Sequence, residues 1–404
     1  MPRLVAKTRT EAIVLPLIEV LGSVAFLPSL LRRGSLRTEG FGRIGSILWV
    51  NVWGHGDTVL TTPALASLRR AFPGARISLL VQPQTRPLVA QTPYVDEIIT
   101  TTVPWSRSKS KYRFRDYVAG EFPRLLRSLR DRHFDLAIDG HMDARNNMFL
   151  WLIRARRRLG FDYGGGRFFL TDLVKPDFGH PHHADLMVQL AKYAGGHDVL
   201  DGPEVTVSEQ DRRAAQDFWS ERGLENTSLV VGIHPGAGNP VRYWGLEKFA
   251  AVADKLAERH AVKFVCFCQP NGYGKEIPIL SSHVTVSASL NEFMALVERC
   301  DLLLCNDGGP MHIATAVGTP VVAVFGAGEP RWWSPKGRDS EFVALGGFPC
   351  RPCFDHCKFD QPYCLTRLSV EQVLAVTERQ VESLLSAPRR QRRHPKAKLA
   401  EIEP

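Results

Sequence analysis

The chain has 404 residues and a formal net charge of +9, with 44% hydrophobic and 23% charged residues. This length exceeds what one hydrophobic core usually supports, so two domains are expected. The composition is that of a globular protein, which excludes a disordered or multi-span membrane protein for the bulk of the chain. The positive charge favours anionic partners. Nucleic acid is not expected, because no aromatic-interleaved module or zinc-finger pattern accompanies the charge.

The positive charge is concentrated in two places. Residues 389–398 alone carry six lysines and arginines, within a basic tail that we place at 387–404. The second cluster runs from Arg154 to Arg158. An anionic membrane surface or a phosphorylated acceptor would suit such clusters. We therefore take Arg154, Arg156 and Arg157 as candidate acceptor-binding residues, with a solvated basic helix end as the alternative.

An apolar segment, residues 12–31, lies inside an N-terminal extension that we place at 1–43. Pro16 and Pro28 interrupt it, and Glu19 near its middle would be costly inside a bilayer. We expect a helix that rests on the membrane surface, which predicts a cytoplasmic protein associated peripherally with the inner face of the cell membrane. A spanning anchor and a helix packed on the protein's own surface are the alternatives.

From residue 44 onward, short β-rich runs alternate with helical stretches, a pattern typical of βαβ units with parallel sheets. Strands are predicted at 46–52, 76–81, 97–102, 136–139, 229–233, 263–268, 283–286, 302–305 and 321–325. Helices are predicted at 58–72, 122–132, 209–222, 246–259, 290–299 and 310–317. The stretch 160–183, rich in Gly, Pro, His and aromatic residues, is expected to be irregular. The predicted domains span 44–206 and 229–386, joined by a linker helix region at 207–228.

The first predicted strand ends in Trp53-Gly54-His55-Gly56-Asp57-Thr58. The two glycines allow a tight turn and a close backbone approach to a ligand. Asp57 is either an N-cap of the next helix or a carboxylate that acts as a general base at the carboxyl end of a strand. Gly56 is assigned with it to the acceptor side. The third glycine of the dinucleotide-binding fingerprint is missing.

Two loops of the second half are typical of anion binding. After the strand at 229–233, the small residues Gly236, Ala237 and Gly238 offer backbone N–H groups, with Arg242 close behind. After the strand at 302–305, Asp307 precedes a glycine pair and a helix whose N-terminus offers a seat for a diphosphate. Asp307 itself would suit sugar hydroxyls better than phosphate. The candidate donor-binding residues are Gly236, Ala237, Gly238, Arg242, Asp307, Gly308, Gly309, Pro310, Met311 and His312.

These segments together resemble glycosyltransferase family 9, the heptosyltransferase family. The matching runs are 56–65, 72–77, 234–237, 306–312 and 318–322, within a resemblance that extends from about residue 45 to 375. One departure is the pair Gly308-Gly309, because Gly309 follows Gly308 where Thr-Gly is usual before the Pro-Met-His. The resemblance implies a GT-B fold, with two doubly wound Rossmann-like α/β domains facing across a cleft. It also implies inversion at the anomeric carbon, no metal and no cofactor, with Asp57 as the catalytic base.

The resemblance therefore predicts an inverting glycosyltransferase. The expected donor is a nucleotide sugar, ADP-heptose above all, and the expected acceptor is a lipopolysaccharide core or a similar glycolipid or oligosaccharide. The donor should bind mainly to the second domain and the acceptor to the first. Alternatives are a GT-B transferase with another sugar nucleotide and acceptor, a sugar-nucleotide 2-epimerase, and a catalytically silent carbohydrate-binding or scaffold protein.

Two further clusters can be read in more than one way. Cys350, Cys353, Cys357 and Cys364 are candidate ligands of a structural zinc ion, with free thiols or disulfides as alternatives. His180, His182 and His183 are candidates for contacts to an anionic acceptor. Metal binding by these histidines is a less favoured hypothesis, because no carboxylate motif lies near them in the sequence.

Overall fold

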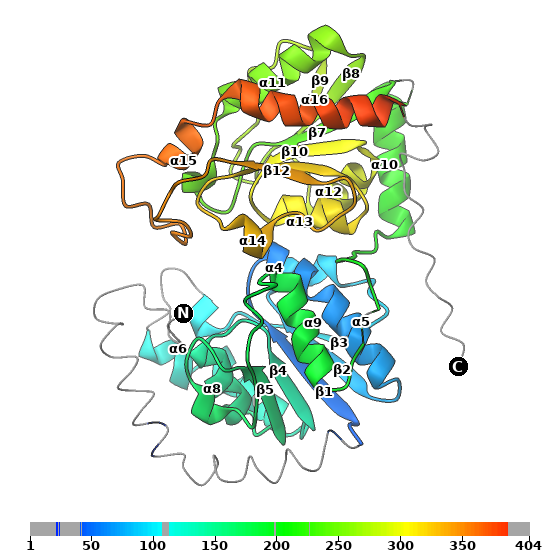
Figure 1. Cartoon of the computed structure of the whole chain (residues 1–404). Helices are drawn as coiled ribbons and strands as arrows, with labels where there is room; N and C mark the ends of the chain where they lie inside the picture. Colours follow the sequence, from blue (N-terminus) through cyan, green and yellow to red (C-terminus); the bar gives the residue numbers. More distant parts are fainter. Residues whose placement is uncertain are drawn as a thin grey trace. The chain divides into compact units, whose positions relative to one another are not determined.

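The computed structural model describes residues 22, 24, 41, 43–106, 113–197, 199–225 and 227–386. The chain divides into two compact units, Met1–Asp201 and Gly202–Pro404. Each unit contains one six-stranded sheet whose strands are all parallel, with helices packed around it (Figure 1). The predicted α/β class and the GT-B pattern of two doubly wound domains are confirmed by this architecture.

The first unit is built on the strand order β3-β2-β1-β4-β5-β6. The strands are β1 Ser46–Asn51, β2 Arg76–Val81, β3 Glu97–Thr100, β4 Leu136–Asp139, β5 Arg157–Phe161 and β6 Asp172–Val174. The helices are α4 His55–Leu60, α5 Thr62–Ala71, α6 Phe114–Val118, α7 Glu121–Arg130, α8 Ala144–Leu152 and α9 His183–Tyr193. The central strands β1 and β4 are almost wholly buried, as expected of parallel strands covered on both faces.

The second unit repeats this winding in the order β12-β11-β10-β7-β8-β9. Its strands are β7 Leu229–His234, β8 Val262–Phe267, β9 His283–Val286, β10 Leu302–Asn306, β11 Val321–Phe325 and β12 Glu341–Ala344. Its helices are α10 Glu209–Glu221, α11 Leu246–Arg259, α12 Leu290–Arg299, α13 Gly309–Ala316, α14 Pro330–Trp333, α15 Tyr363–Thr366 and α16 Val370–Ser386. A buried cluster that joins β7, β8, β10, β11, α11 and α16 forms the core of this unit.

The predicted elements differ from the observed ones at a few positions. The expected helix 58–72 is two helices, because α4 begins earlier, at His55, and ends at Leu60. The expected irregular stretch 160–183 contains the end of β5 and all of β6. Both strands are short and close to glycines and aromatic residues, which hides the alternation that marks a strand. Strand β12 and helices α6, α8, α9, α14, α15 and α16 were also not predicted.

The two segments that were predicted to contact the membrane lie almost wholly outside the described residues. Apart from residues 22 and 24, the segment 12–31 lies outside them, and so does the basic tail 387–404. Within the described part of the chain, no helix combines the length and the apolar character needed to cross a membrane.

Candidate active-site residues

The predicted catalytic residue lies at the topological switch point of the first sheet. Strands β1 and β4 are neighbours, and the sheet continues outward from them in opposite directions. Open parallel sheets bind ligands beyond the carboxyl ends of the strands at this point. Asp57 follows β1, and His141 follows β4 by two residues. The chain therefore places a carboxylate and an imidazole where this fold puts its ligands.

The two oxygens of the Asp57 carboxylate lie in different environments. Asp57 is the third residue of α4, so it is not the N-cap, a position occupied by Gly54. Its Oδ2 accepts a hydrogen bond of 3.1 Å from the Gly54 backbone N–H. Its Oδ1 lies 3.7 Å from Nε2 of His183, and the side chain is 30% exposed. Oδ2 therefore stabilises the start of the helix, while Oδ1 faces His183.

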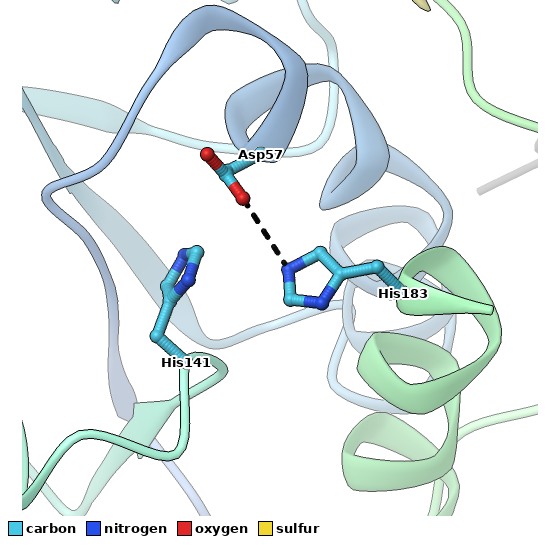
Figure 2. Close-up of side chains that lie close together, drawn as sticks. All are labelled: Asp57, His141 and His183. Carbon is cyan, nitrogen blue, oxygen red and sulfur yellow. Dashed lines mark ion pairs between the residues drawn. The ribbon is translucent and has the colours of Figure 1, made fainter. Parts of the chain in front are cut away.

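Two histidines accompany Asp57, and Figure 2 shows the three side chains turned toward one another. His183 is the first residue of α9, and its ring centroid lies 5.2 Å from that of His141. Each of the three side chains offers a ligand atom within 4.8 Å of the other two. His183 belongs to the His-rich run noted in the sequence, but its proximity to Asp57 was not predicted. His141 gave no sequence signal, because it stands alone between the strand and α8.

Burial sets the charges around this cluster. Desolvation lowers the pKa of His141 to about 3, against an opposing effect of the Asp57 charge, and it also lowers the pKa of His183. Both imidazoles are therefore neutral near pH 7. Asp139, at the end of β4, is fully buried, and desolvation raises its pKa to about 7. Its carboxylate accepts hydrogen bonds from Asn146 Nδ2 at 2.8 Å and from the His141 N–H at 3.1 Å, and so orders the loop that carries His141.

The donor-side residues lie at the equivalent place in the second sheet. The loop with Gly236, Ala237 and Gly238 follows β7, and Asp307 follows β10, the neighbour of β7. Asn306 ties the two loops together, because its Nδ2 donates to the Pro235 carbonyl at 2.5 Å. A Cβ atom on Gly236 would overlap the Gln269 side chain, which would have to move to admit it.

Arg242 lies among carboxylates. It donates from Nε and Nη2 to Asp355 at 2.6 and 2.9 Å, and from Nη1 to Asp307 at 3.4 Å. Asp307 is buried, and desolvation raises its pKa to about 6, although the Arg242 charge works in the opposite direction. Neither contact was predicted from the sequence, because Arg242 and its partners Asp307 and Asp355 are far apart in the chain. The structure brings the predicted Arg242 and Asp307 together.

The glycine pair opens α13 as expected. Gly308 is the N-cap, Gly309 the first residue, and Pro310 the second residue rather than the first. The side chains of Met311 and His312 are buried in the unit, at 0% and 4% exposure. Their side chains hold α13 against its surroundings, so only the backbone of these two residues is left for the predicted anion site.

The arginine cluster is not brought together with Asp57. Arg157 begins β5 and pairs in register with Leu136, the first residue of β4, so it lies at the amino edge of the sheet. Asp57 follows the carboxyl edge. Arg157 is buried in an ion pair with Asp172 on β6, with N–O distances of 2.5 and 3.1 Å. Arg154 and Arg156 are exposed. The alternative of a basic helix end holds for Arg154, which follows α8, but not for Arg157.

The four C-terminal cysteines line one pocket, together with Arg351 and Tyr363. All four are free thiols, so the disulfide alternative is wrong in this structure. Among the described residues, the groups of three possible metal ligands within 4.8 Å of one another contain no cysteine. Structural zinc at Cys350, Cys353, Cys357 and Cys364 stays a prediction.

Two parallel sheets wound in this way, each with its polar loops at the switch point, are the architecture of the GT-B fold. The sequence model of glycosyltransferase family 9 (heptosyltransferase) matches residues 122–363. The chain belongs to this family, and it is a glycosyltransferase.

Known proteins similar to the chain agree with this assignment. The chain is 25% identical over 350 residues to lipopolysaccharide heptosyltransferase 3 of Escherichia coli K12, covering 80% of this chain and 95% of that protein. It is 24% identical to lipopolysaccharide core heptosyltransferase OpsX of Haemophilus influenzae, covering 65% and 76%. The structure of a family 9 glycosyltransferase from Veillonella parvula superposes with a TM-score of 0.67 at 25% identity, covering 84% and 97%. That of E. coli ADP-heptose LPS heptosyltransferase II gives a TM-score of 0.64 at 20% identity, covering 85% and 98%.

Proposed function

We propose that this protein transfers heptose from ADP-heptose to a lipopolysaccharide core acceptor, with inversion at the anomeric carbon. The support for heptose and for the acceptor comes from family membership and from relatives named as lipopolysaccharide heptosyltransferases, which match over 95% of their length in the first case. The observation that carries the mechanism is the position of Asp57, half-exposed at the switch point of the first sheet.

In this mechanism Asp57 Oδ1 accepts the proton of the acceptor hydroxyl while the oxygen of that hydroxyl attacks the anomeric carbon. Asp57 can perform this role without losing its structural one, because Oδ2 holds the Gly54 N–H. Gly56 precedes it in α4 and belongs to the same acceptor-binding surface. Arg154 and Arg156 are exposed at the other edge of the sheet, where they can contact only a distant part of a large acceptor.

The nucleoside diphosphate binds to the second unit. The N-terminal N–H groups of α13 and the loop Gly236–Gly238 stabilise the negative charge that develops on the leaving diphosphate. Arg242 adds a positive charge, and its guanidinium group forms ion pairs with Asp355 and Asp307. Asp307 accepts hydrogen bonds from donor hydroxyls, and the reaction proceeds without a metal ion.

The acceptor is embedded in a membrane, so association with the cytoplasmic face of that membrane forms part of the proposal. The apolar segment 12–31 and the six basic residues of 389–398 support it. Each basic side chain near an anionic surface contributes about 1 kcal/mol. Flotation with anionic liposomes tests this point: the full chain should float and be released by salt, and a chain of residues 43–386 should stay behind. Equal flotation of the two would contradict a role for the termini.

The transfer itself is tested by a donor screen with ADP-, UDP-, GDP- and TDP-sugars, read by thermal shift and followed by product analysis. ADP-heptose should give the largest shift and a heptosylated acceptor. Preferential use of another sugar nucleotide would replace the donor assignment and leave the family unchanged.

A further inference from the structure

The histidines beside Asp57 have a hydrogen-bonding arrangement that the transfer mechanism does not require. His141 Nε2 lies 3.0 Å from Asn51 Oδ1, and Asn51 Nδ2 donates to Thr61 Oγ1 at 3.1 Å. The Thr61 hydroxyl in turn donates to the Asp57 carbonyl at 2.8 Å. A carbonyl oxygen can only accept, so the direction of this chain of hydrogen bonds is determined at its end.

This direction determines the tautomer of His141. Because the Thr61 proton goes to the carbonyl, Thr61 Oγ1 must accept from the Asn51 amide group, and Asn51 Oδ1 must then accept from His141. His141 Nε2 therefore carries the proton, and Nδ1 carries the lone pair. A histidine that donates one ring N–H to a fixed acceptor while its other nitrogen is free to coordinate is the usual arrangement of a metal ligand.

The Asp57 carboxylate is also held in place by a hydrogen bond. Asp57 Oδ2 accepts from Gly54 N–H, which orients Oδ1 toward His183 Nε2 at 3.7 Å. That separation is too long for a hydrogen bond, but it suits two atoms that ligate one ion at about 2.0–2.2 Å each. Within the described ranges, no lysine or arginine forms an ion pair with Asp57.

From these contacts we propose that Asp57, His141 and His183 form a binding site for a late first-row divalent cation, Zn²⁺ above all, which inhibits the enzyme. The three ligand atoms come from α4, the loop after β4 and the start of α9, and they lie within 4.8 Å of one another (Figure 2). Two imidazoles and one carboxylate suit zinc and its neighbours, and three protein ligands leave a position for water. The harder Mg²⁺ prefers oxygen ligands and should bind poorly.

The inhibition follows from the role of Asp57 and rests on the proposed function, whereas the binding does not. A lone pair of Oδ1 that is donated to Zn²⁺ can no longer accept the proton of the acceptor hydroxyl. The ion also occupies the space at the base, so it should compete with the acceptor and leave donor binding unchanged. The transfer reaction does not use this ion.

Binding is measured by titrating the chelator-treated full-length protein with Co²⁺ and Zn²⁺, with calorimetry and the visible spectrum of Co²⁺ as readouts. Cobalt separates this site from the cysteine pocket, because thiolate ligands add a charge-transfer band in the near ultraviolet. The wild type should bind one Co²⁺ without that band at this site. His183→Gln and His141→Gln should each weaken this binding by about 100-fold or more. His180→Gln, an exposed histidine three residues from His183, is the matched control and should bind as the wild type does.

The site is overturned if no Co²⁺ binds, or if all the bound Co²⁺ shows the thiolate band. It is also overturned if binding is unchanged in both histidine variants, or if the His180→Gln control loses binding equally. Circular dichroism of each variant shows whether it is folded. In activity assays, Zn²⁺ should raise the KM for acceptor, and EDTA should reverse the effect. If metal binding is present but heptosyl transfer is not observed in metal-free buffer, the proposed function fails and the site stands. If transfer is observed and Zn²⁺ leaves it unchanged, the inhibitory role fails alone.

Discussion

Asp57 Oδ1 lies 3.7 Å from His183 Nε2, at the topological switch point of the first sheet. The contact joins a residue of α4 to one of α9, 126 positions later in the chain. It indicates that the free oxygen of Asp57 faces a polar, half-buried environment rather than bulk solvent. The same residue also supports the start of its helix, so its structural and chemical roles need to be separated by experiment.

Replacing Asp57 with Asn separates the two roles. The Asn side-chain oxygen can still accept from the Gly54 N–H, so the fold should be retained, while the proton acceptor is lost. We expect turnover to fall on the order of 10²–10⁴-fold with donor affinity nearly unchanged. Steady-state kinetics and donor titration measure both quantities. Turnover like that of the wild type would reduce Asp57 to a helix-start residue.

Replacing Arg242 with Ala should weaken binding of the nucleoside diphosphate. The change removes a charge-assisted contact worth about 1.5–3 kcal/mol and leaves Asp307 and Asp355 facing the anion. Product inhibition by ADP measures the effect. Arg379→Ala, an exposed arginine on α16, is the control and should leave ADP inhibition as it is. Unchanged inhibition by ADP in Arg242→Ala would reject the assignment.

The arginine cluster gives a test of stability against binding. Arg157 and Asp172 form an ion pair with side-chain exposures of 7% and 0%. Removing one partner leaves the other charge buried, so Arg157→Ala should lower the free energy of unfolding by about 3–5 kcal/mol. Arg156→Ala, which changes an exposed side chain, should stay within about 0.5 kcal/mol of the wild type. Chemical denaturation measures both. A stable Arg157→Ala protein with a raised KM for acceptor would instead support the original acceptor-binding role.

Most of the fold could be predicted from sequence, because buried parallel strands leave a strong apolar signal. β2, β4, β9 and β11 have the expected bounds, as do helices α11 and α12. The predicted alternation of strands and helices placed Asp57 and Asp307 just after strand ends. The contacts of His141 with Asn51 and of Arg242 with Asp355 could not be predicted, since they join residues 90 and 113 positions apart. The burial of Arg157 could not be predicted, because a basic run carries no sign that one member faces inward toward an aspartate on the next strand.

Asp139 should make stability depend on pH. Its pKa is raised from 3.8 to about 7 by burial, so between these values the unfolded chain has lost a proton that the folded one keeps. The folded state then binds more protons, and the free energy of unfolding falls as pH rises through this window. Each pKa unit corresponds to about 1.4 kcal/mol. Thermal unfolding at pH 5 and pH 8 should show a larger decrease in Tm for the wild type than for Asp139→Asn. Equal decreases would mean that the buried carboxyl is ionised at both pH values.

Metal-independent heptosyl transfer by this chain can be assayed with purified components. Purified full-length protein is mixed with ADP-heptose and a lipopolysaccharide core acceptor that lacks the heptose, in the presence of EDTA. ADP should be released in step with a heptosylated product seen by mass spectrometry, and omitting the acceptor should abolish its release. Donor consumption without acceptor, absence of the heptosylated product, or a strict requirement for added Mg²⁺ would contradict it.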